Sequence, residues 1–503
     1  ARKKSGTFYT PRVVVDYMVD EALVGYLKPK LDEHQMTDER GLSSHKNISQ
    51  ALDLGPAPGE LELSRNYDVA KSSNSGSDGK KIEAQLRALL SYEDIELSFS
   101  EDEKDRLIAS IEGIRAIDPA CGSGAFPMGL LQKLIHVLKR LDPDNSRWKA
   151  ALRDPLIKQL KLVEASRNIG AKSEQIEALK DQLEKLDRDF SETSNFPDYA
   201  RKLYVIDKCI HGVDIQPIAV QIAKLRFFIS LVVSQKIDET AENLNITPLP
   251  NLETRLVAAN ALRPIDRPRT DDMFRNPDIE ETEKALVEAN ERYFGARNRR
   301  TKIKAKTQIG DLRDKLSGLL RQTNDLPEET AEQIACWDPF DQNVAADFFD
   351  PEWMFGLTEK FNIVMANPPY VRQEKIGRDK VFFKKRADEN KRSKETVRLY
   401  QSFTGAADYL VYFMERGLDL LAPGGSFVFI TSNKWYRVAY GKKIRSWIGR
   451  SALLRSIIDF GDADVFDAAA YPTIIMATKR PHMLAAPDPK DVFLAWNWPP
   501  EMG

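Results

Sequence analysis

Cysteine and histidine are both scarce in this sequence. The 503 residues include three cysteines, Cys121, Cys209 and Cys336, which lie far apart, and five scattered histidines. An odd number of distant cysteines argues against a disulfide framework and is typical of a reducing compartment. The cysteines and histidines also lack the close spacing that a zinc site uses. We therefore expect a cytoplasmic protein with no metal site.

Long apolar runs are missing as well. No run approaches the roughly 20 residues that are needed to span a bilayer. Residues 1–5 are mostly basic and polar, and the apolar segment of a secretion signal does not follow them. We therefore expect neither a membrane anchor nor export.

The balance of charge is close to neutral. A net charge of −2 does not by itself favour nucleic-acid binding, so a polyanionic ligand would have to bind local basic patches. The 42% hydrophobic and 30% charged residues are typical of a globular protein, and 503 residues are too many for one compact core. We expect two or three folding units.

Seven segments have the composition of β-strands, and helical periodicity follows several of them, as in 217–225. They are 114–118, 209–214, 254–259, 361–366, 426–431, 454–459 and 473–477. The alternation of strand and helix predicts an α/β fold with a mostly parallel seven-stranded sheet and helices on both faces. Such sheets bind ligands at the carboxyl ends of their strands.

Three segments interrupt this alternation. Residues 61–82, rich in Ser, Asn, Gly and Lys, predict a flexible loop. A helical insert over 140–200 carries an apolar stripe with spacings of 3 and 4, and a charged helical insert occupies 271–345. The stripe consists of Ile176, Leu179, Leu183, Leu186 and Phe190. It favours a structural helical hairpin over a coiled coil that binds a partner.

A glycine-containing turn, 117–126, lies between the first predicted strand and a helix that begins near Met128. Glycines allow a sharp turn and a close approach of a ligand to the backbone. The Gly-x-Gly-x-x-Gly spacing of a dinucleotide fold is absent. The shorter Gly122-Ser123-Gly124 suits a methionine–adenosine ligand, which brings no pyrophosphate. An ordinary strand-to-helix turn has a similar sequence, so this segment alone does not decide.

Two more strand ends carry polar residues. Asp214 ends the second predicted strand, where a carboxylate can accept hydrogen bonds from both hydroxyls of a ribose. Asn260 follows the third strand and has the polar groups to recognise an adenine amine. Polar residues at three successive strand ends predict a nucleoside site. A second glycine-rich segment, 53–60, is interpreted as a surface turn because its two prolines lack the N–H groups that a ligand loop uses.

The most specific motif, Asn367-Pro368-Pro369-Tyr370, follows the fourth predicted strand. The exocyclic amine of a nucleobase is a poor nucleophile because its lone pair is delocalised into the ring. Two acceptors aimed at its hydrogens, the Asn367 side-chain oxygen and the Pro368 carbonyl, would favour a pyramidal nitrogen. The prolines hold these groups rigid, and Tyr370 offers a flat face on which a base can stack. A rigid turn with a packed tyrosine is the structural alternative.

These motifs resemble the amino-methyltransferases that modify nucleobases, specifically the adenine-N6 DNA methyltransferases of the gamma arrangement, in which cofactor segments precede the catalytic loop. The resemblance extends from about residue 6 to residue 480, inserts excepted. Residues 408–413 resemble the helix after the loop. Residues 350–356 resemble the methyltransferase portion of large restriction–modification and phage-exclusion enzymes. The resemblance implies a Rossmann-like class I methyltransferase fold and S-adenosyl-L-methionine as cofactor.

The resemblance also implies roles for individual residues. An N-terminal segment, 6–19, would close over the methionine end of the cofactor, with Thr10 on its carboxylate. Phe466 would stack on a flipped base together with Tyr370, and Tyr471 is the alternative to Phe466. The implied cofactor-binding residues are Tyr9, Thr10, Asp118, Pro119, Ala120, Cys121, Gly122, Ser123, Gly124, Phe126, Asp214, Ile215, Asn260 and Ala261.

The chain is predicted to divide into six parts. They are 1–50, a helical segment that closes the cofactor site; 51–113, a linker and helical region; 114–270, the cofactor-binding half with a helical hairpin insert at 140–200; 271–345, the charged helical insert; 346–480, the catalytic half; and 481–503, the start of a connection to a target-recognition domain. The last part is too short for such a domain. We therefore expect a specificity domain or subunit to come from a longer protein, of which this chain is a piece, or from another chain. No nuclease motif is apparent.

DNA contacts are predicted after the catalytic loop. An adenine amine inside a duplex is unreachable, so the base has to be flipped out, at a cost of about a few kcal/mol. Basic residues within 372–398 would anchor phosphates and offset that cost. Those singled out are Arg372, Lys375, Lys384, Lys385 and Arg386. A second basic cluster, 297–306, is interpreted as a solvated helix face. The predicted partner is double-stranded DNA.

Three functions compete. The first is S-adenosylmethionine-dependent methylation of adenine N6 in DNA, within a restriction–modification or phage-defence system. The second is a methyltransferase of the same fold that acts on RNA or on a protein glutamine amide, since an amide nitrogen poses the same chemical problem. The third is a binding module with a dead site, which the intact Asn367 and Asp118 disfavour. The N-terminal cofactor segment and the regions around Asp408 and Phe466 favour the first.

Overall fold

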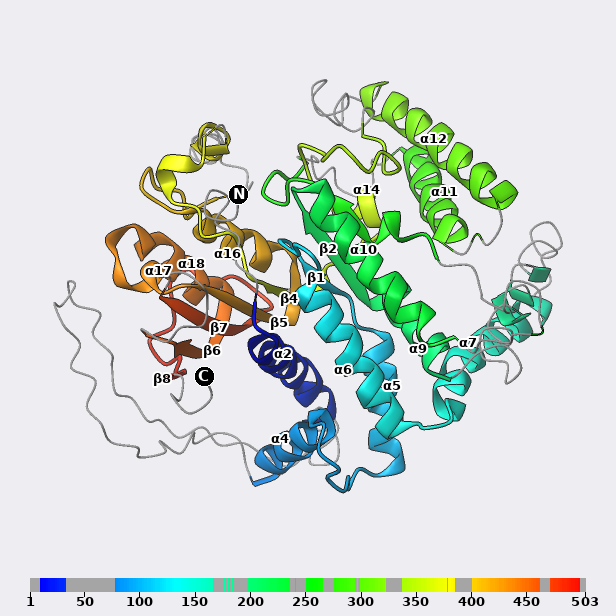
Figure 1. Ribbon diagram of the computed structural model, residues 1–503, viewed down its shortest axis with the longest axis horizontal. Helices are drawn as coiled ribbons and strands as arrows, with labels where there is room; N and C mark the ends of the chain where they lie inside the picture. The colour runs from blue at the N-terminus through cyan, green and yellow to red at the C-terminus, as the bar shows by residue number, and fades with distance from the viewer. Residues whose placement is uncertain are drawn as a thin grey trace.

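An eight-stranded sheet runs through the structure, with helices packed on both of its faces (Figure 1). The structure is a computed structural model. It describes residues 10–32, 77–165, 176–177, 179–180, 182–184, 197–235, 240, 250–265, 276–294, 296, 299–322, 337–377, 379–384, 400–461 and 471–497. Within these ranges, no helix combines the length and the apolar character needed to cross a bilayer.

The strands lie in the order β3-β2-β1-β4-β5-β7-β6-β8. Their bounds are β1 Ala116–Asp118, β2 Ile210–Asp214, β3 Leu256–Ala258, β4 Phe361–Ala366, β5 Leu421–Ser432, β6 Ala452–Asp459, β7 Pro472–Lys479 and β8 Leu494–Asn497. All pairings are parallel except those of β7, which runs antiparallel to β5 and β6. From β1 the chain moves outward through β2 and β3, and β4 then lies on the other side of β1. Parallel α/β sheets bind ligands where the strand order changes direction in this way.

The seven predicted strands are all present, and the predicted α/β class is confirmed. The predicted number of strands is wrong, because residues 494–497 add an eighth strand, β8, beside β6. All four side chains of β8 are exposed. A strand with no buried side lacks the alternation of apolar and polar residues by which a half-buried strand is recognised in a sequence. The sequence predicts only a connection in this segment.

Helices cover both faces of the sheet. Their bounds are α2 Arg12–Asp32, α4 Ser77–Leu90, α5 Glu101–Glu112, α6 Ala125–Leu141, α7 Ser146–Ala165, α9 Pro197–Tyr204, α10 Pro217–Val232, α11 Pro277–Phe294, α12 Arg299–Gln322, α14 Pro351–Phe355, α16 Tyr409–Leu420, α17 Lys434–Arg437 and α18 Lys442–Ser451. Helices α2, α6 and α10 pack into a first hydrophobic core on one face. Helices α14, α16 and α18 pack into a second core on the other.

Strand side chains alternate between these two cores. In β5, Val428 and Ile430 belong to the first core, whereas Phe427 and Phe429 belong to the second. All four side chains are fully buried. Burial on both faces explains why 426–431 is an almost unbroken apolar run in the sequence.

The inserts are partly as predicted. Residues 77–82 belong to α4, so the predicted loop over 61–82 is wrong at its C-terminal end, where the apolar periodicity of α4 begins; its remainder lies outside the described residues. Of the apolar stripe in the 140–200 insert, Leu179 is buried, while Leu186 and Phe190 lie outside the described residues. The charged insert is helical, with α11 packed against α12.

Helix α16 approaches β5 closely because residue 417 has no side chain. A Cβ atom built on Gly417 would lie 2.8 Å from Phe429 Cζ and 2.9 Å from Phe427 Cε2. These two buried rings stack on each other at 4.2 Å between centroids, so neither can move away freely. We predict that Gly417→Ala lowers the free energy of unfolding by about 1–2 kcal/mol, because overpacking outweighs the gain in helix propensity. Thermal unfolding measures this as a lower Tm.

Gly310 in α12 provides the matched control for this prediction. In the described part of the chain, no atom lies within 4 Å of a Cβ built on Gly310. Gly310→Ala should therefore raise the free energy of unfolding by about 0.5–1 kcal/mol, through helix propensity alone. Shifts of the same sign in both variants would contradict the packing explanation.

His211 on β2 is a buried neutral imidazole. Its ring lies 4.9 Å from the ring of Phe355 and 5.5 Å from that of Phe361, and Nδ1 lies 3.2 Å from the Ala116 carbonyl oxygen. Burial, and next the charge of Arg255, hold the pKa of His211 well below its usual range. Below about pH 6.5 the unfolded chain therefore binds a proton that the folded chain does not. The stability from the neutral ring is present above that pH and is lost as the pH falls.

We predict that His211→Gln reduces this acid sensitivity. Below about pH 6, the free energy of unfolding of the native protein should fall more steeply than that of the variant, by up to about 1.4 kcal/mol per pH unit. Urea unfolding between pH 5 and pH 7.5 measures the two slopes. His482→Gln, at an exposed position, is the control. Equal slopes for His211→Gln and the native protein would contradict the prediction.

Candidate functional site

A pocket of about 370 Å³ opens at the carboxyl ends of β1, β2, β3 and β4. Pockets of this size hold small organic ligands. It is lined by Thr10, Asp118, Pro119, Ala120, Cys121, Gly122, Ser123, Ala125, Phe126, Asp214, Ile215, Gln216, Ala259, Asn260, Ala261, Asn367, Pro369, Val371, Lys375, Tyr409 and Phe413. Most of the residues predicted to bind the cofactor therefore lie around one cavity.

The turn between β1 and α6 forms one wall of the pocket. Gly122 has a φ of 52° and Gly124 a φ of 81°, in the left-handed region that favours glycine. A Cβ on Gly124 would also lie 3.0 Å from Cβ of Ala223 on α10. The Gly124 amide donates to the Cys121 carbonyl at 2.8 Å, which closes the turn. The left-handed backbone conformation thus favours glycine at both positions. Gly122 lines the pocket, whereas Gly124 does not.

Two carboxylates, those of Asp118 and Asp214, line the pocket next to this turn. Asp118 is almost fully buried and accepts a hydrogen bond from the Ala120 amide at 3.0 Å. Asp214 accepts one from Gly122 N at 2.9 Å and another from Gln216 N at 2.8 Å. Burial raises the pKa of both groups, and the charge of Asp214 raises that of Asp118 further.

The electrostatics of these carboxylates suit a polar or cationic ligand. In the described part of the chain, neither Asp118 nor Asp214 forms an ion pair. Each carboxylate oxygen has two acceptor sites. The Asp214 oxygens each accept one backbone N–H, so each retains a site for a ligand hydroxyl.

Asn260 lines the pocket, but its amide already has partners. Its oxygen accepts from the Leu262 amide at 3.2 Å, and its nitrogen lies 3.5 Å from an Asp379 oxygen. Asp379 also pairs with Arg263 at 2.7 Å and accepts a hydrogen bond from the Tyr409 hydroxyl. This network joins the end of β3, residues 379–384 and the start of α16. Asn260 therefore also has a structural role that the sequence does not predict.

The side chain of Asn367 has one hydrogen-bonded end and one free end. Its nitrogen donates to the Thr10 hydroxyl oxygen at 3.1 Å. Its oxygen is buried and has no hydrogen-bond partner among the described residues. Thr10 is itself buried and lies two residues before the first residue of α2. The bond to Thr10 holds the amide nitrogen, and the oxygen is an unused acceptor on a residue that lines the pocket.

The rest of the motif is divided between pocket and core. Pro369 lines the pocket, whereas Pro368 and Tyr370 are outside the lining. The ring of Tyr370 is partly buried against the first core, and burial raises the pKa of its hydroxyl. The structure thus brings Asn367 and Pro369 into the site but does not bring the Tyr370 ring there.

Two aromatic residues of the pocket were not predicted. Tyr409 and Phe413 lie one helical turn apart on α16 and both line the pocket. The Tyr409 amide donates to the carbonyl of Val371, a third unpredicted residue, at 3.1 Å. An i, i+4 spacing places two side chains on the same face of a helix. Within 408–413 this spacing was the signal that could have identified the pair.

The DNA and stacking candidates are only partly described. Arg372, Lys375 and Lys384 are exposed, and Lys375 lines the pocket. Tyr471 is half-exposed and does not line it. Tyr9, Phe466, Lys385, Arg386 and the glycine-rich segment 53–60 lie outside the described residues. Of the second basic cluster, Arg299, Arg300 and Lys304 are exposed, as expected of a solvated helix face.

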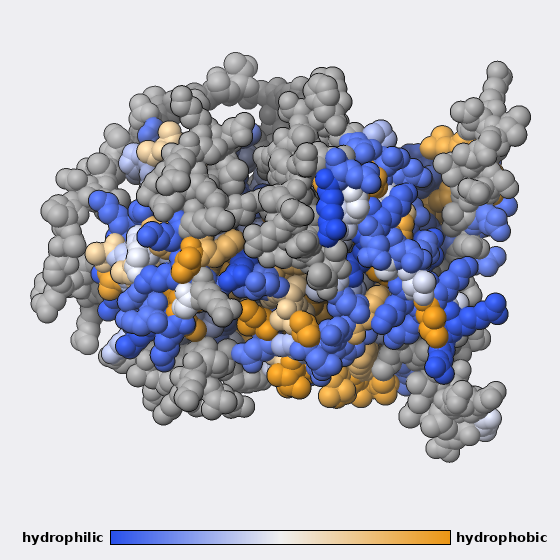
Figure 2. Space-filling view, turned by 90° about the horizontal axis from the view of Figure 1, so that it is seen from above, coloured by the Kyte–Doolittle hydropathy of each residue, from blue (hydrophilic) through white to orange (hydrophobic). Residues whose placement is uncertain are grey.

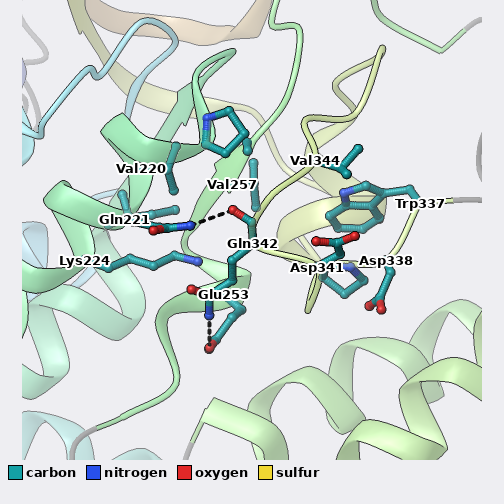
Figure 3. Close-up of a pocket in the computed structure, with 14 residues that line it drawn as sticks. Val220, Gln221, Lys224, Glu253, Val257, Trp337, Asp338, Asp341, Gln342 and Val344 are labelled. Atoms are coloured by element: carbon teal, nitrogen blue, oxygen red, sulfur yellow. Dashed lines mark hydrogen bonds between the residues drawn. The ribbon is translucent and has the colours of Figure 1, made fainter.

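A second, smaller cavity lies between α10, β3 and residues 337–344 (Figure 3). Its volume of about 20 Å³ holds no more than one water-sized molecule. Lys224 and Glu253 both line it, and burial lowers the pKa of Lys224, which the charge of Glu253 partly offsets. Gln342 donates to Glu253 at 3.3 Å and accepts from Gln221 at 2.7 Å. This cavity is too small for a substrate, so the larger pocket is the candidate site.

The chain is similar to methyltransferases of restriction–modification systems. The Type II methyltransferase M.XhoI of Xanthomonas vasicola is 32% identical over 152 residues, which cover 29% of this chain and 24% of that protein. M.BstVI of Geobacillus stearothermophilus is 34% identical over 142 residues, which cover 27% of this chain and 23% of that protein. The matched segments span about a quarter of the length of these relatives. The solved M protein of the Type I restriction enzyme EcoKI aligns over 84% of this chain and 52% of its own, with 10% identity and a TM-score of 0.31.

A sequence model described as Eco57I restriction-modification methylase matches residues 208–466, just over half of the chain. The matched range begins just before β2, contains the Asn367–Tyr370 loop and extends past β6. The α/β fold described above is the Rossmann-like class I methyltransferase fold that the sequence motifs imply. The chain belongs to the Eco57I restriction-modification methylase family.

Proposed function

We propose that this protein methylates adenine N6 in double-stranded DNA, with S-adenosyl-L-methionine as the methyl donor, within a restriction–modification or phage-defence system. The observation that carries the proposal is the Asn367 side-chain oxygen, a buried acceptor beside the pocket without a partner among the described residues. Family membership and the Type II methyltransferases among its relatives support it.

The residues of the pocket fit S-adenosylmethionine. When bound, this cofactor supplies a methyl group on a positively charged sulfur. Asp118 and Asp214 provide two carboxylates that form no ion pair with the described residues, which favours a ligand with cationic groups and ribose hydroxyls. The Thr10 hydroxyl accepts from Asn367 and still has a proton to donate to a ligand carboxylate. Phe413 offers an apolar wall for an adenine ring.

Asn367 has the geometry to activate an amine. Its nitrogen donates to Thr10, which leaves the buried oxygen as the unpartnered end, among the described residues, of a side chain that lines the pocket. That oxygen would accept a hydrogen bond from the exocyclic N–H of adenine, and the Pro368 carbonyl is the second acceptor. Two acceptors on the amine hydrogens favour the pyramidal nitrogen whose lone pair is free to attack. Pre-positioned acceptors of this kind need no rearrangement during the reaction.

Three exposed basic residues around the loop support a polyanionic substrate. Arg372 and Lys375 follow the loop directly, and Lys384 ends the next described helical turn. Because Lys375 also lines the pocket, a phosphate bound there would lie beside the nucleotide that enters it. A flipped base of duplex DNA brings such phosphates with it. Stacking by Phe466 or Tyr370 stays a prediction.

We predict that Asn367→Ala retains cofactor binding and lowers methyl transfer at least about a hundredfold, as removal of one pre-positioned hydrogen-bonding group typically does. Transfer of a labelled methyl group from S-adenosylmethionine to duplex DNA measures the rate, and calorimetry measures the affinity. Asn343→Ala is the matched control, because that asparagine is exposed and does not line the pocket. Transfer per folded molecule should be unchanged in the control.

Two outcomes would count against the proposed function. Unreduced transfer by Asn367→Ala would remove the role of that side chain. Label in RNA or in protein glutamine, with none in N6-methyladenine of DNA, would favour the alternative substrates of the same fold. Parallel reactions with DNA, RNA and protein therefore belong in the same experiment.

A second prediction concerns the cofactor. Asp214→Asn should raise the Kd for S-adenosylmethionine at least about tenfold, because it removes a charge and one acceptor for the Gly122 and Gln216 amides. Asp102→Asn is the control, since Asp102 is an exposed carboxylate on α5. Isothermal calorimetry measures both affinities. An unchanged Kd for Asp214→Asn would place the cofactor elsewhere.

A further inference from the structure

Helix α10 exposes an apolar face to solvent. Seven aliphatic side chains between residues 215 and 233 are between 40% and 72% exposed. They are Ile215, Ile218, Ile222, Leu225, Ile229, Val232 and Val233, and we call them the α10 stripe. In Figure 1, α10 lies in front of the sheet, on the side that faces the viewer. That side forms the lower edge of the space-filling view, and hydrophobic residues gather along it (Figure 2).

The stripe carries no charge, in a chain in which 30% of residues are charged. Gln216 is the one polar residue among the exposed positions of 215–233. The two charged residues of the helix are used elsewhere: Lys224 is buried, and Arg226 donates to the Ser123 carbonyl at 2.9 Å. A helix that is apolar on all sides is typically buried on all sides. The fold itself buries only the side that carries Val220, Ala223 and Phe227.

The area of the stripe matches that of a stable interface. The seven side chains expose roughly 700 Å², which exceeds the about 300–600 Å² of the largest apolar patch on a typical monomer. A standard protein–protein interface buries about 800 Å² on each partner. Since the patch is nearly large enough by itself, few further contacts would be needed.

The spacing of the stripe indicates what would cover it. Within α10, the exposed residues from Ile218 to Ile229 follow intervals of 4, 3 and 4, which is the a/d repeat of a helix that packs against another helix. These intervals are the same when read from either end. An antiparallel copy of the same helix therefore presents an apolar residue opposite every apolar residue.

We propose that two copies of this chain associate through α10, packed antiparallel about a two-fold axis near the middle of the helix. Ile222 of one copy then lies opposite Leu225 of the other, and Ile218 lies opposite Ile229. In a two-fold contact the same surface of each copy faces the other. A face with charges of one sign would therefore repel its counterpart, whereas this uncharged face does not. The antiparallel arrangement also opposes the two helix dipoles favourably.

Sedimentation of the 503-residue chain over a range of micromolar concentrations tests the proposal. We expect a species of twice the monomer mass. Ile222→Glu and Leu225→Lys, each alone, should weaken association at least about a hundredfold, because each would bury an unpaired charge. Both positions are about half exposed within one copy, so folding should be unaffected, and circular dichroism checks this. Leu162→Lys, at an exposed position of α7, is the matched control and should leave the dimer intact.

Mixing the two charged variants tests the geometry. In the antiparallel register, the new carboxylate at position 222 faces the new ammonium at position 225 of the other copy, so an equimolar mixture should recover the dimer. A monomeric native chain at every concentration would overturn the proposal. So would a dimer that survives Ile222→Glu. Failure of the mixture to associate would overturn the antiparallel pairing.

Discussion

The parallel pairing of β1 with β4 is the constraint on which the site depends. Ala116 lies opposite Ile363, and Ile117 lies opposite Val364. This register is fixed at its amino end, where the Arg115 amide donates to the Asn362 side chain at 2.8 Å and the Asn362 amide donates to the Arg115 carbonyl at 2.9 Å. A slip of one residue would turn every side chain of β4 to the other face of the sheet. The register thus sets where Asn367 lies relative to Asp118.

The chain on either side of this pairing is held by polar contacts that join distant segments. The Thr10 hydroxyl, before α2, accepts a hydrogen bond from the Asn367 side-chain amide. The Asp408 carboxylate accepts one from the Gln373 backbone amide at 2.9 Å and another from the Tyr440 hydroxyl at 3.0 Å. Hydrogen bonds between charged or buried groups in a low-dielectric setting are the strong ones. The loop that contains the two prolines is therefore fixed from both sides as well as by its own stiffness. A rigid loop of this kind favours positioning over induced rearrangement.

Much of this arrangement could be predicted from the sequence, because strands buried on both faces are apolar runs and parallel strand ends converge. The seven segments, the glycine turn and the polar residues Asp118, Asp214 and Asn367 follow from those two regularities. The remaining features depend on tertiary contacts that leave no local signal. The packing of Tyr370 into the first core and the ties of Asn260 to Leu262 and Asp379 depend on which neighbours fold next to them. Strand β8 could not be predicted, because its side chains are all exposed and its sequence therefore carries no pattern of buried residues.

Ile215 belongs to two surfaces at once, since it lines the pocket and begins the α10 stripe. Two binding events that share a residue are thermodynamically linked. If a ligand in the pocket alters the conformation or exposure of Ile215, it changes the affinity of the stripe for its partner. The partner must then change the affinity of the pocket for the ligand by the same factor. Ile215, a half-exposed residue just after β2, can in this way couple ligand binding in the pocket to association through the α10 stripe. This coupling requires no movement of the sheet.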